Sequence, residues 1–288
     1  MKIALDPYML RGLPMGEMVR TAADIGYRWI ELSPRAEFMP FFLHPRADDA
    51  RVAELKEALR ATGTGLSSIL PLYRWSSPIE EERRAAVRYW RRMIEVAVEL
   101  DCRLMNSEFN GRPELAAESE AAFWRSLEEL LPVFEREGIA LNLEAHPDDF
   151  IEVNGPAVDL VRAINKPWVN YLYCAPHTFH LSGEAPGADI RAMLDYAGDR
   201  LAHLHIADSF DHKGSSGLRY ILNPPGTPAR IHQHLDIGQG EVDWDVFFST
   251  LRDIGFDGVA TACVFAWEER AVESSAFMLE RITKELGG

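Results

Sequence analysis

The chain has 288 residues, of which 47% are hydrophobic and 26% charged, an ordinary balance for a globular protein with a sizeable core. Its 30 basic and 45 acidic residues give a net charge of −15. A field of that sign repels nucleic acid and anionic membranes, so we expect neither as a partner. A small neutral substrate is compatible with this charge.

The N-terminal stretch "MKIALDPYML" lacks the long apolar core of a signal peptide, and no apolar run reaches the roughly 18 residues of a membrane span. The three cysteines, Cys102, Cys174 and Cys263, lie far apart without paired spacing. We therefore expect a cytoplasmic protein whose thiols are reduced.

Short apolar runs alternate with longer amphipathic runs along the whole chain. The short runs predict strands over 2–6, 28–32, 66–70, 103–108, 139–144, 169–174, 201–207 and 258–264. The runs that follow them predict helices over 15–25, 48–61, 79–100, 115–136, 156–164, 188–197, 243–253 and 267–285.

Eight strand-then-helix units predict a parallel sheet, and in this length they fit a closed (β/α)₈ TIM barrel, an α/β fold, as one domain over 1–288. A doubly wound sheet is the alternative. That fold usually has fewer units and often has a glycine fingerprint after its first strand, which "LDPYMLRGLP" lacks. We expect the long irregular segment 208–241 to lie over the active-site face.

Side chains that bind metals or move protons gather where the predicted strands end, which is where such barrels carry their active sites. These residues are Asp6, Glu31, Glu108, Glu144, Cys174, His205 and Cys263, with His146 and His177 just beyond. Because unpaired carboxylates at close range repel one another, a bound cation is the natural compensation. The pattern therefore predicts a divalent metal site.

Purely structural interpretations also exist for several of these residues. Glu144 could cap the following helix or pair with an arginine, and Cys174 and Cys263 could be small buried apolar side chains. Cys102 begins a strand at the opposite end, so we interpret it as a core residue.

Three further positions have two interpretations each. We expect only one of His203 and His205 to face the barrel interior, and we interpret His203 as structural. The "HQH" motif of the long segment could be a solvated surface cluster. Arg219 could bind a phosphate or hydroxyl over the site, or lie on the surface.

Four strand ends resemble a known family, the xylose-isomerase-like barrels called sugar phosphate isomerases/epimerases. The stretches "LNLEAHP", "CAPH", "HLHIAD" and "GFDGVATAC" match the places where that family binds one divalent metal through Glu, Asp, His and Glu. The resemblance implies that Glu144, Cys174, His205 and Cys263 are the metal ligands. Cys174 takes the place of the Asp, and Cys263 that of the second Glu.

The resemblance also implies an enzyme that isomerises or epimerises its substrate by moving a proton next to a carbonyl. Glu144, His177 and Glu108 are the catalytic candidates, and His146, His177 and Arg219 the candidates for substrate binding. Thiolate ligands favour zinc, with manganese or cobalt as alternatives.

More narrowly, "ELSPR", "MNSEFNGRPE" and "ARIHQHLDIGQGEVDW" are similar to an inositol-catabolism protein of that family. The expected substrate is a polyol or keto-sugar, in particular an intermediate of inositol catabolism. One alternative is a lyase or dehydratase that acts on a keto-inositol or keto-glycoside through the same enediolate. Another is a non-catalytic sugar-binding accessory protein with a decayed metal site. A homo-oligomer is left open.

Overall fold

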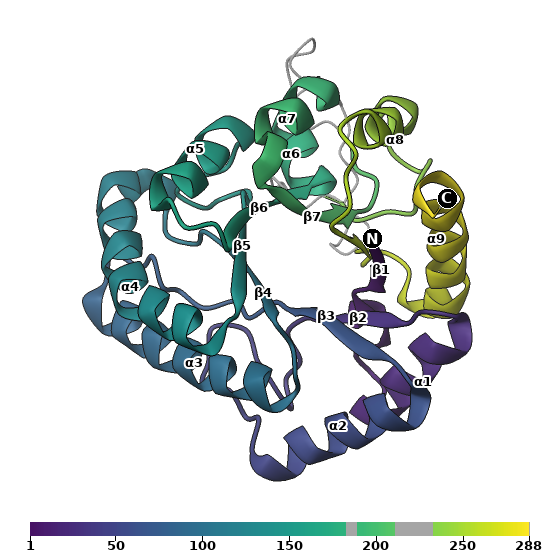
Figure 1. Cartoon of the computed structure of the whole chain (residues 1–288), viewed down its shortest axis with the longest axis horizontal. Helices are drawn as coiled ribbons and strands as arrows, with labels where there is room; N and C mark the ends of the chain where they lie inside the picture. The colour runs from purple at the N-terminus through teal and green to yellow at the C-terminus, as the bar shows by residue number, and fades with distance from the viewer. Residues whose placement is uncertain (183–188, 211–232, 288) are drawn as a thin grey trace, which may run out of the picture.

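In a computed structural model, the chain forms a closed barrel of eight parallel strands inside a ring of helices (Figure 1). The structure describes residues 1–182, 189–210 and 233–287. The strands are β1 (Lys2–Leu5), β2 (Trp29–Leu32), β3 (Gly65–Ile69), β4 (Leu104–Glu108), β5 (Ala140–Glu144), β6 (Val169–Cys174), β7 (Leu201–Ile206) and β8 (Val259–Ala262). They neighbour one another in chain order, and β8 closes on β1. The predicted barrel is confirmed.

The helices follow the strands at the predicted places, within a few residues. They are α1 (Met15–Ile25), α2 (Asp49–Thr62), α3 (Glu80–Glu99), α4 (Ala116–Glu137), α5 (Asn154–Ile164), α6 (Ala175–Ser182), α7 (Ile190–Ala197), α8 (Trp244–Asp253) and α9 (Ala271–Leu286). One of them, α6, was not predicted. It begins directly after β6, whereas the next predicted helix was the one over 188–197.

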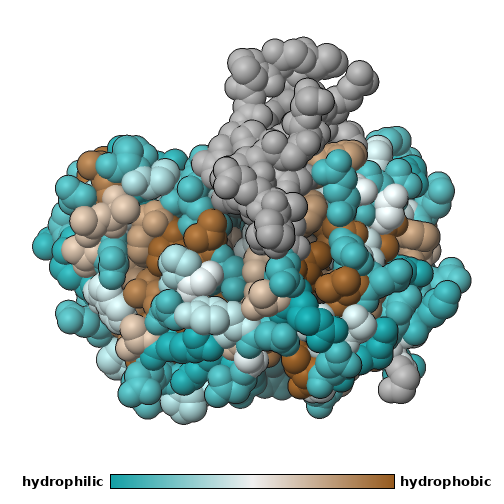
Figure 2. Space-filling view, turned by 90° about the horizontal axis from the view of Figure 1, so that it is seen from above, coloured by the Kyte–Doolittle hydropathy of each residue, from teal (hydrophilic) through white to brown (hydrophobic). Residues whose placement is uncertain are grey.

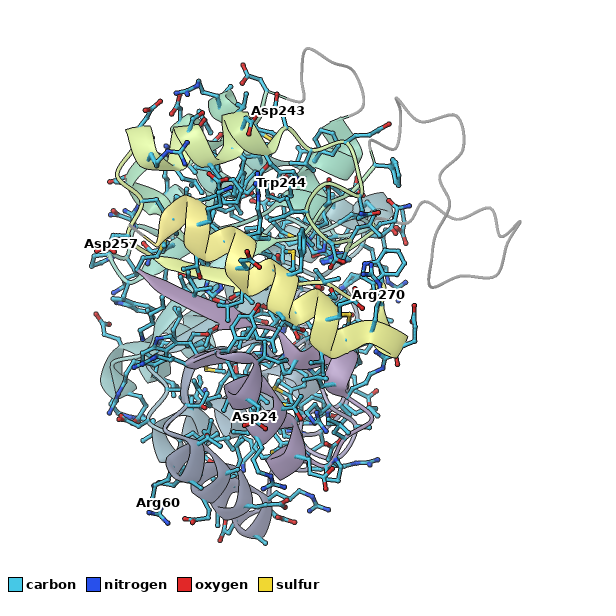
Figure 3. All side chains as sticks on the ribbon, turned by 90° about the vertical axis from the view of Figure 1, so that its right-hand side faces the viewer. Asp24, Arg60, Asp243, Trp244, Asp257 and Arg270 are labelled. Carbon is cyan, nitrogen blue, oxygen red and sulfur yellow. The ribbon has the colours of Figure 1, made fainter. Side chains whose placement is uncertain are left out.

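Local signals explain where several helices begin and end. Asp48 caps α2, because its carboxylate accepts a hydrogen bond from the backbone N–H of Arg51. Asp243 caps α8 in the same way, and Figure 3 shows it beside Trp244 at the start of that helix. Gly26 ends α1 with φ 115°, a left-handed conformation that glycine adopts without strain.

The apolar core lies between the barrel and its helices, whereas much of the barrel interior is polar. On the outer side Trp75 and Trp90 stack at 4.8 Å between ring centroids, and both are fully buried. The fully buried polar side chains of the strands include Glu31, Ser68, Asn106, Asn142, His203 and Thr261. Because barrel interiors are usually filled by branched apolar residues, this polar layer indicates a specific role.

The face of the molecule seen in Figure 2 is largely hydrophilic, with smaller hydrophobic patches between the polar residues. This pattern is typical of helices that present their charged side to water. Within the described ranges, none of the helices combines the length and the apolar character needed to cross a membrane.

The contact between β7 and β8 gives a first test of the fold. A Cβ at Gly258, just before β8, would lie 2.8 Å from the carbonyl carbon of Ala202 and closer still to its oxygen. Gly258→Ala should therefore lower the free energy of unfolding by about 1–3 kcal/mol, as overpacking does. In α5, a Cβ at Gly155 would meet nothing within 4 Å, so Gly155→Ala should be neutral or slightly stabilising. Denaturant titration measures both, and equal values would contradict this account.

Candidate active site

The strand-end residues converge at one end of the barrel. Strand register pairs Glu108 with Glu144 and Cys174 with His205. Together with neighbouring loops, these strand ends enclose a cavity of about 290 Å³. Its acidic, histidine and cysteine lining residues are Asp6, Glu108, Glu144, His146, His177, His205, His234 and Cys263. The barrel thus brings together residues that lie far apart in the sequence.

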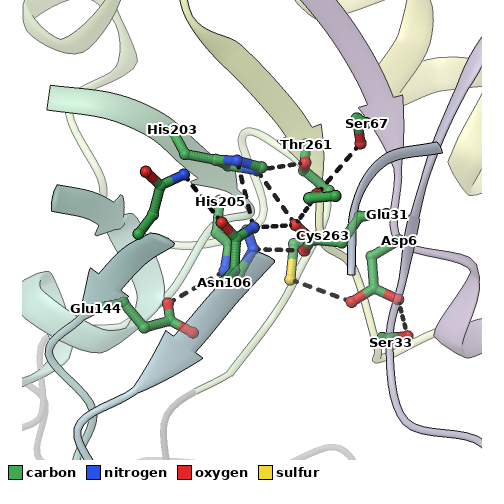
Figure 4. A network of polar contacts seen from close by, with 12 residues as sticks. Asp6, Glu31, Ser33, Ser67, Asn106, Glu144, His203, His205, Thr261 and Cys263 are labelled. Atoms are coloured by element: carbon green, nitrogen blue, oxygen red, sulfur yellow. Dashed lines mark hydrogen bonds and ion pairs between the residues drawn. The ribbon is translucent and has the colours of Figure 1, made fainter. Parts of the chain in front are cut away.

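His205 lies between two buried carboxylates (Figure 4). Its Nε2 is 2.6 Å from Glu31 Oε1, and its Nδ1 is 3.1 Å from Glu144 Oε2. Burial alone would lower the pKa of His205, but the two carboxylates outweigh it and hold that pKa well above its ordinary value. Without a metal, His205 is therefore an imidazolium that neutralises part of the buried negative charge.

A layer of polar side chains beneath His205 holds Glu31 in place. Ser68 donates a hydrogen bond of 2.6 Å to Glu31 Oε2, and the Asn106 amide donates to the same oxygen. Burial would raise the pKa of Glu31, but His205 and His203 lower it to about 2. Glu31 is thus ionised, and the hydrogen bonds from Ser68 and Asn106 hold its carboxylate in position.

The expectation that only one of the two strand histidines faces the interior was wrong. Residues two apart in a strand share a face, because side chains alternate with a period of two. His203 and His205 both point into the barrel, and His203 Nε2 lies 2.8 Å from Thr261 Oγ1. Asn106 Nδ2 lies 3.3 Å from His203 Nδ1. His203 belongs to the polar layer, so its structural interpretation agrees with these contacts.

Three of the four predicted metal ligands lie within reach of one ion. One ligand atom each from Glu144, Cys174 and His205 lies within 4.8 Å of the others, and all three residues are buried. A carboxylate oxygen, a sulfur and an imidazole nitrogen are ligands that zinc accepts. Burial, followed by Glu144, raises the pKa of the Cys174 thiol to about 12, so a bound cation is needed to make it a thiolate. The residues present therefore fit a divalent metal.

The fourth predicted ligand, Cys263, faces another partner. Its Sγ lies 3.9 Å from Asp6 Oδ2. In the part of the chain that the structure describes, it joins none of the groups of three donors that could hold an ion. Asp6 is itself held by hydrogen bonds from the Tyr8 backbone N–H and the Ser33 hydroxyl, at 2.9 and 2.6 Å.

The predicted catalytic and substrate-binding residues surround the same cavity. His177 lies in the first turn of α6, and its Nδ1 is 3.4 Å from Glu144 Oε2. Burial, followed by the nearby His146, lowers the pKa of His177 to about 4, so its ring is neutral at pH 7. Glu108 lies 3.6 Å from His146, and burial, followed by Glu144, raises its pKa.

Sequence reasoning missed His234, which belongs to the "HQH" motif. It is 5% exposed and lines the cavity, so for this residue the surface interpretation was wrong. Its Nδ1 lies 2.7 Å from the carbonyl oxygen of Cys263, and its ring stacks on Phe265 at 4.3 Å. The motif was noticed, but no strand periodicity predicted which way its side chains point. His232 lies outside the described residues.

A second omission is Asp149, which forms a further group of potential ligands with Glu108 and His146. Asp149 Oδ2 accepts a hydrogen bond of 2.6 Å from the backbone N–H of Asn110. Burial, followed by Glu108, raises the pKa of Asp149 well above its ordinary value. The signal was the acidic pair in "HPDD", which directly follows the strand that carries Glu144.

Asp208 joins the two ends of the long segment 208–241. Its carboxylate accepts hydrogen bonds from the backbone N–H groups of Ser209, Gly238 and Val242 and from Trp244 Nε1. The backbones of Asp208 and Leu235 also pair. Residues 211–232, which include Arg219, lie outside the described residues, so the roles expected of Arg219 and of the loop remain predictions.

The fold and the site define a parallel barrel with carboxylate, imidazole and thiol groups, which are potential metal ligands, at the C-terminal ends of its strands. The chain belongs to the xylose isomerase-like TIM barrel family, whose model matches residues 19–281. The family predicted from the strand-end motifs is confirmed.

Two curated relatives are both named inosose isomerase. The protein from Bacillus licheniformis is 28% identical over 48% of this chain and 45% of its own length. The protein from Bacillus velezensis is 23% identical over 83% of this chain and 79% of its own length. The chain thus matches less than half of the first relative. Both names differ from that of IolH, the inositol-catabolism protein that the narrower motifs resemble.

Solved structures share the whole fold at low identity. D-psicose 3-epimerase from Clostridium cellulolyticum H10, crystallised with D-tagatose, has a TM-score of 0.75 and 18% identity over 99% of both chains. The IolI protein with a bound zinc atom has a TM-score of 0.72 and 17% identity over 100% of both chains. At these identities the likeness establishes the barrel and leaves the reaction to be argued from the site.

The buried carboxyl of Asp6 gives a pH-dependent prediction. Burial, followed by Glu31, raises its pKa from 3.8 to about 7, so the folded chain holds this proton more tightly than the unfolded chain. Its contribution to stability is therefore full at low pH and is lost as pH rises towards 7.

In chelator-treated protein, Asp6→Asn should gain stability relative to the parent by about 1–3 kcal/mol between pH 5 and pH 8. Denaturant titration at the two pH values measures this difference. Asp24→Asn is the control, because Asp24 is exposed on α1 (Figure 3). A parent and an Asp6→Asn variant that differ equally at both pH values would contradict the raised pKa.

Proposed function

We propose that the protein is a metal-dependent isomerase or epimerase that acts on a polyol or keto-sugar, in particular an intermediate of inositol catabolism. The observation that carries this proposal is the group of potential metal donors Glu144, Cys174 and His205, next to a cavity that Glu108, Glu144 and His205 line. The names of the curated relatives and the zinc atom in a protein of the same fold support it.

The ion would be held at Cys174, where two groups of donors meet. One group adds Glu144 and His205, the predicted ligands, and the other adds His177 and His234. When bound, a divalent metal supplies Lewis acidity that polarises a substrate carbonyl and its neighbouring hydroxyl.

Proton transfer next to a carbonyl needs a base and an acid, and two neighbouring carboxyl groups provide them. Burial would raise the pKa of Glu144, but His205 and His177 hold it well below its ordinary value. Glu108, its register partner on β4, has a raised pKa. Because their environments separate the two pKa values, Glu144 is the carboxylate that takes a proton from carbon and Glu108 the acid that returns one.

His146, His177 and the apolar cavity wall would bind the substrate and exclude water. With a pKa near 4, His177 is neutral at pH 7, so one ring nitrogen can donate to a substrate hydroxyl while the other accepts. The rings of His146 and His177 lie 4.4 Å apart. Apolar side chains such as Leu70, Leu72 and Phe265 line the remaining wall and limit the access of water to a reactive intermediate.

Isotope exchange tests the reaction directly. The protein is incubated in heavy water with a panel of inositols, keto-inositols and keto-sugars, and deuterium at carbon is measured by mass spectrometry and NMR. We expect exchange for at least one compound, and Glu108→Gln should slow it by about 10²–10⁴-fold. Glu54→Gln, on the exposed side of α2, is the matched control.

The products decide between the alternatives. A dehydrated or deglycosylated product would identify a lyase that uses the same residues. No exchange and no conversion with any compound, despite bound sugar, would instead support an accessory binding protein and contradict the proposal.

Metal binding at Cys174 gives a separate test. Cobalt-loaded protein should show an intense sulfur-to-metal charge-transfer band, which Cys174→Ser should abolish and Cys102→Ser should leave intact. Cys102 is the matched control because it is a buried thiol whose Sγ donates to the backbone oxygen of Leu104 at 3.3 Å. Cys174→Asp should shift the preference towards manganese or magnesium, which favour oxygen ligands. A cobalt-loaded protein without this band would show that Cys174 is not a ligand.

A further inference from the structure

A second cavity, of about 380 Å³, adjoins the active-site cavity, and Glu108 and His146 line both of them. The segments that follow β2, β3, β4 and β5 form the remaining wall, which includes Phe42, Arg74, Asn110, Arg112 and Asp148. Glu108 is the acid of the proposed reaction. A molecule whose reacting carbon lies at Glu108 can therefore extend into the second cavity.

Asn110 brings an unused hydrogen-bond acceptor to the wall of the second cavity. Its backbone N–H donates to Asp149 Oδ2 at 2.6 Å, and its side-chain Nδ2 donates to Glu108 Oε2 at 3.1 Å. Its Oδ1 is buried and, within the described ranges, has no hydrogen-bond partner. A buried acceptor without a donor is unfavourable, so a hydroxyl group of a bound molecule that reaches this oxygen would stabilise it.

The backbone at Asn110 has a conformation that few residues adopt. Asn110 and Gly111 have φ 58° and 87°, both in the left-handed region. A Cβ at Gly111 would lie 2.8 Å from Ser119 Cβ and 2.9 Å from Phe150 Cδ1, so the chain packs closely here. The Phe150 backbone N–H also donates to the Asn110 carbonyl at 3.1 Å. Such conformations persist where the surroundings hold them, and they cluster at binding sites.

Arg112 supplies unused donors on the same wall. Its backbone N–H donates to Ser119 Oγ at 3.0 Å, which fixes the base of the side chain. Its guanidinium makes no hydrogen bond or ion pair with the residues that the structure describes. A guanidinium presents five N–H donors in one plane, so it can donate to two neighbouring hydroxyl oxygens at once.

The charges and the aromatic wall indicate which kind of ligand fits the second cavity. Its charged lining residues are Arg74, Arg112, Glu82, Glu108, Asp148 and Asp149. Acidic residues outnumber the arginines, which disfavours phosphate and other anions. Arg74 is also engaged already, because it lies over the Phe42 ring at 4.7 Å and 3.8 Å from Glu82. Hydrogen-bonding groups of both kinds beside an aromatic ring suit an uncharged ring with several hydroxyl groups.

We propose that the second cavity binds an uncharged sugar or polyol ring, so that the substrate is a glycoside of the keto-sugar or keto-inositol on which the proposed reaction acts. The inference rests on the proposed function and names its substrate class. One ring lies at Glu108 and Glu144 and undergoes proton transfer. The other ring, joined to it by a glycosidic bond that stays intact, binds to Asn110 and Arg112. Binding of the non-reacting ring then positions the reacting one.

Matched substrates test the inference in the metal-loaded, full-length protein. Deuterium exchange at carbon is measured for free keto-sugars and keto-inositols, for their O-glucosides and for their phosphate esters. D-fructose, for example, is compared with its glucosides turanose, maltulose and palatinose and with its phosphates. We expect kcat/KM for at least one glucoside to exceed that for its free parent by about 10-fold or more, as contacts with a non-reacting ring allow.

A variant locates the second ring. The measured quantity is the ratio of kcat/KM for the preferred glucoside to kcat/KM for its free parent. Arg112→Ala should lower this ratio by about 10–100-fold, the usual effect of losing a hydrogen bond to a charged group. Arg60→Ala is the matched control and should keep the ratio, because the Arg60 side chain is 74% exposed in the last turn of α2.

Each other outcome contradicts a defined part of this account. Free keto-sugars or phosphate esters that react as well as every glucoside would overturn the inference and leave the proposed function standing. A glucoside preference that survives unchanged in Arg112→Ala would also overturn it, because the second ring would then bind elsewhere. Exchange with none of the compounds would overturn both the inference and the proposed function.

Discussion

The active-site end of this barrel depends on the balance between buried carboxylates and the imidazole of His205. Glu31 and Glu144 are almost completely removed from water, and ionised carboxylates at such positions are unfavourable unless a cation is close by. His205 is that cation in the metal-free chain, because it bridges the two carboxylates. Beneath it, Ser68 and Asn106 donate hydrogen bonds to Glu31, and His203 helps to lower the pKa of that carboxylate. These contacts explain why the barrel interior is polar at this level.

Two groups of potential metal ligands share Cys174. The first group adds Glu144 and His205, which also contact each other at 3.1 Å. The second group adds His177 and His234, which line the cavity.

Periodicity predicted most of the fold and the strand-end residues. Glu144, Cys174 and His205 were found because parallel strands end at the same edge and each is the last or next-to-last residue of its strand. The helix α6 was missed, since the apolar run before it leads into "APHTF" without a turn signal. His203 was assigned to the wrong face by an error in the strand period. The burial of His234 had no local signal, because it depends on tertiary contacts with Cys263 and Phe265.

Asp208 has a consequence for how this site can change during evolution. Its carboxylate and backbone join the end of β7 to Leu235, Gly238 and Val242, so the chain leaves and re-enters the barrel at fixed points. His234 directly precedes one of those points. Because loop-closure entropy rises only slowly with length, insertions or deletions between the two points cost little and do not displace His234. Substrate preference could therefore diverge through that segment among related proteins while the histidine at its base stays in place.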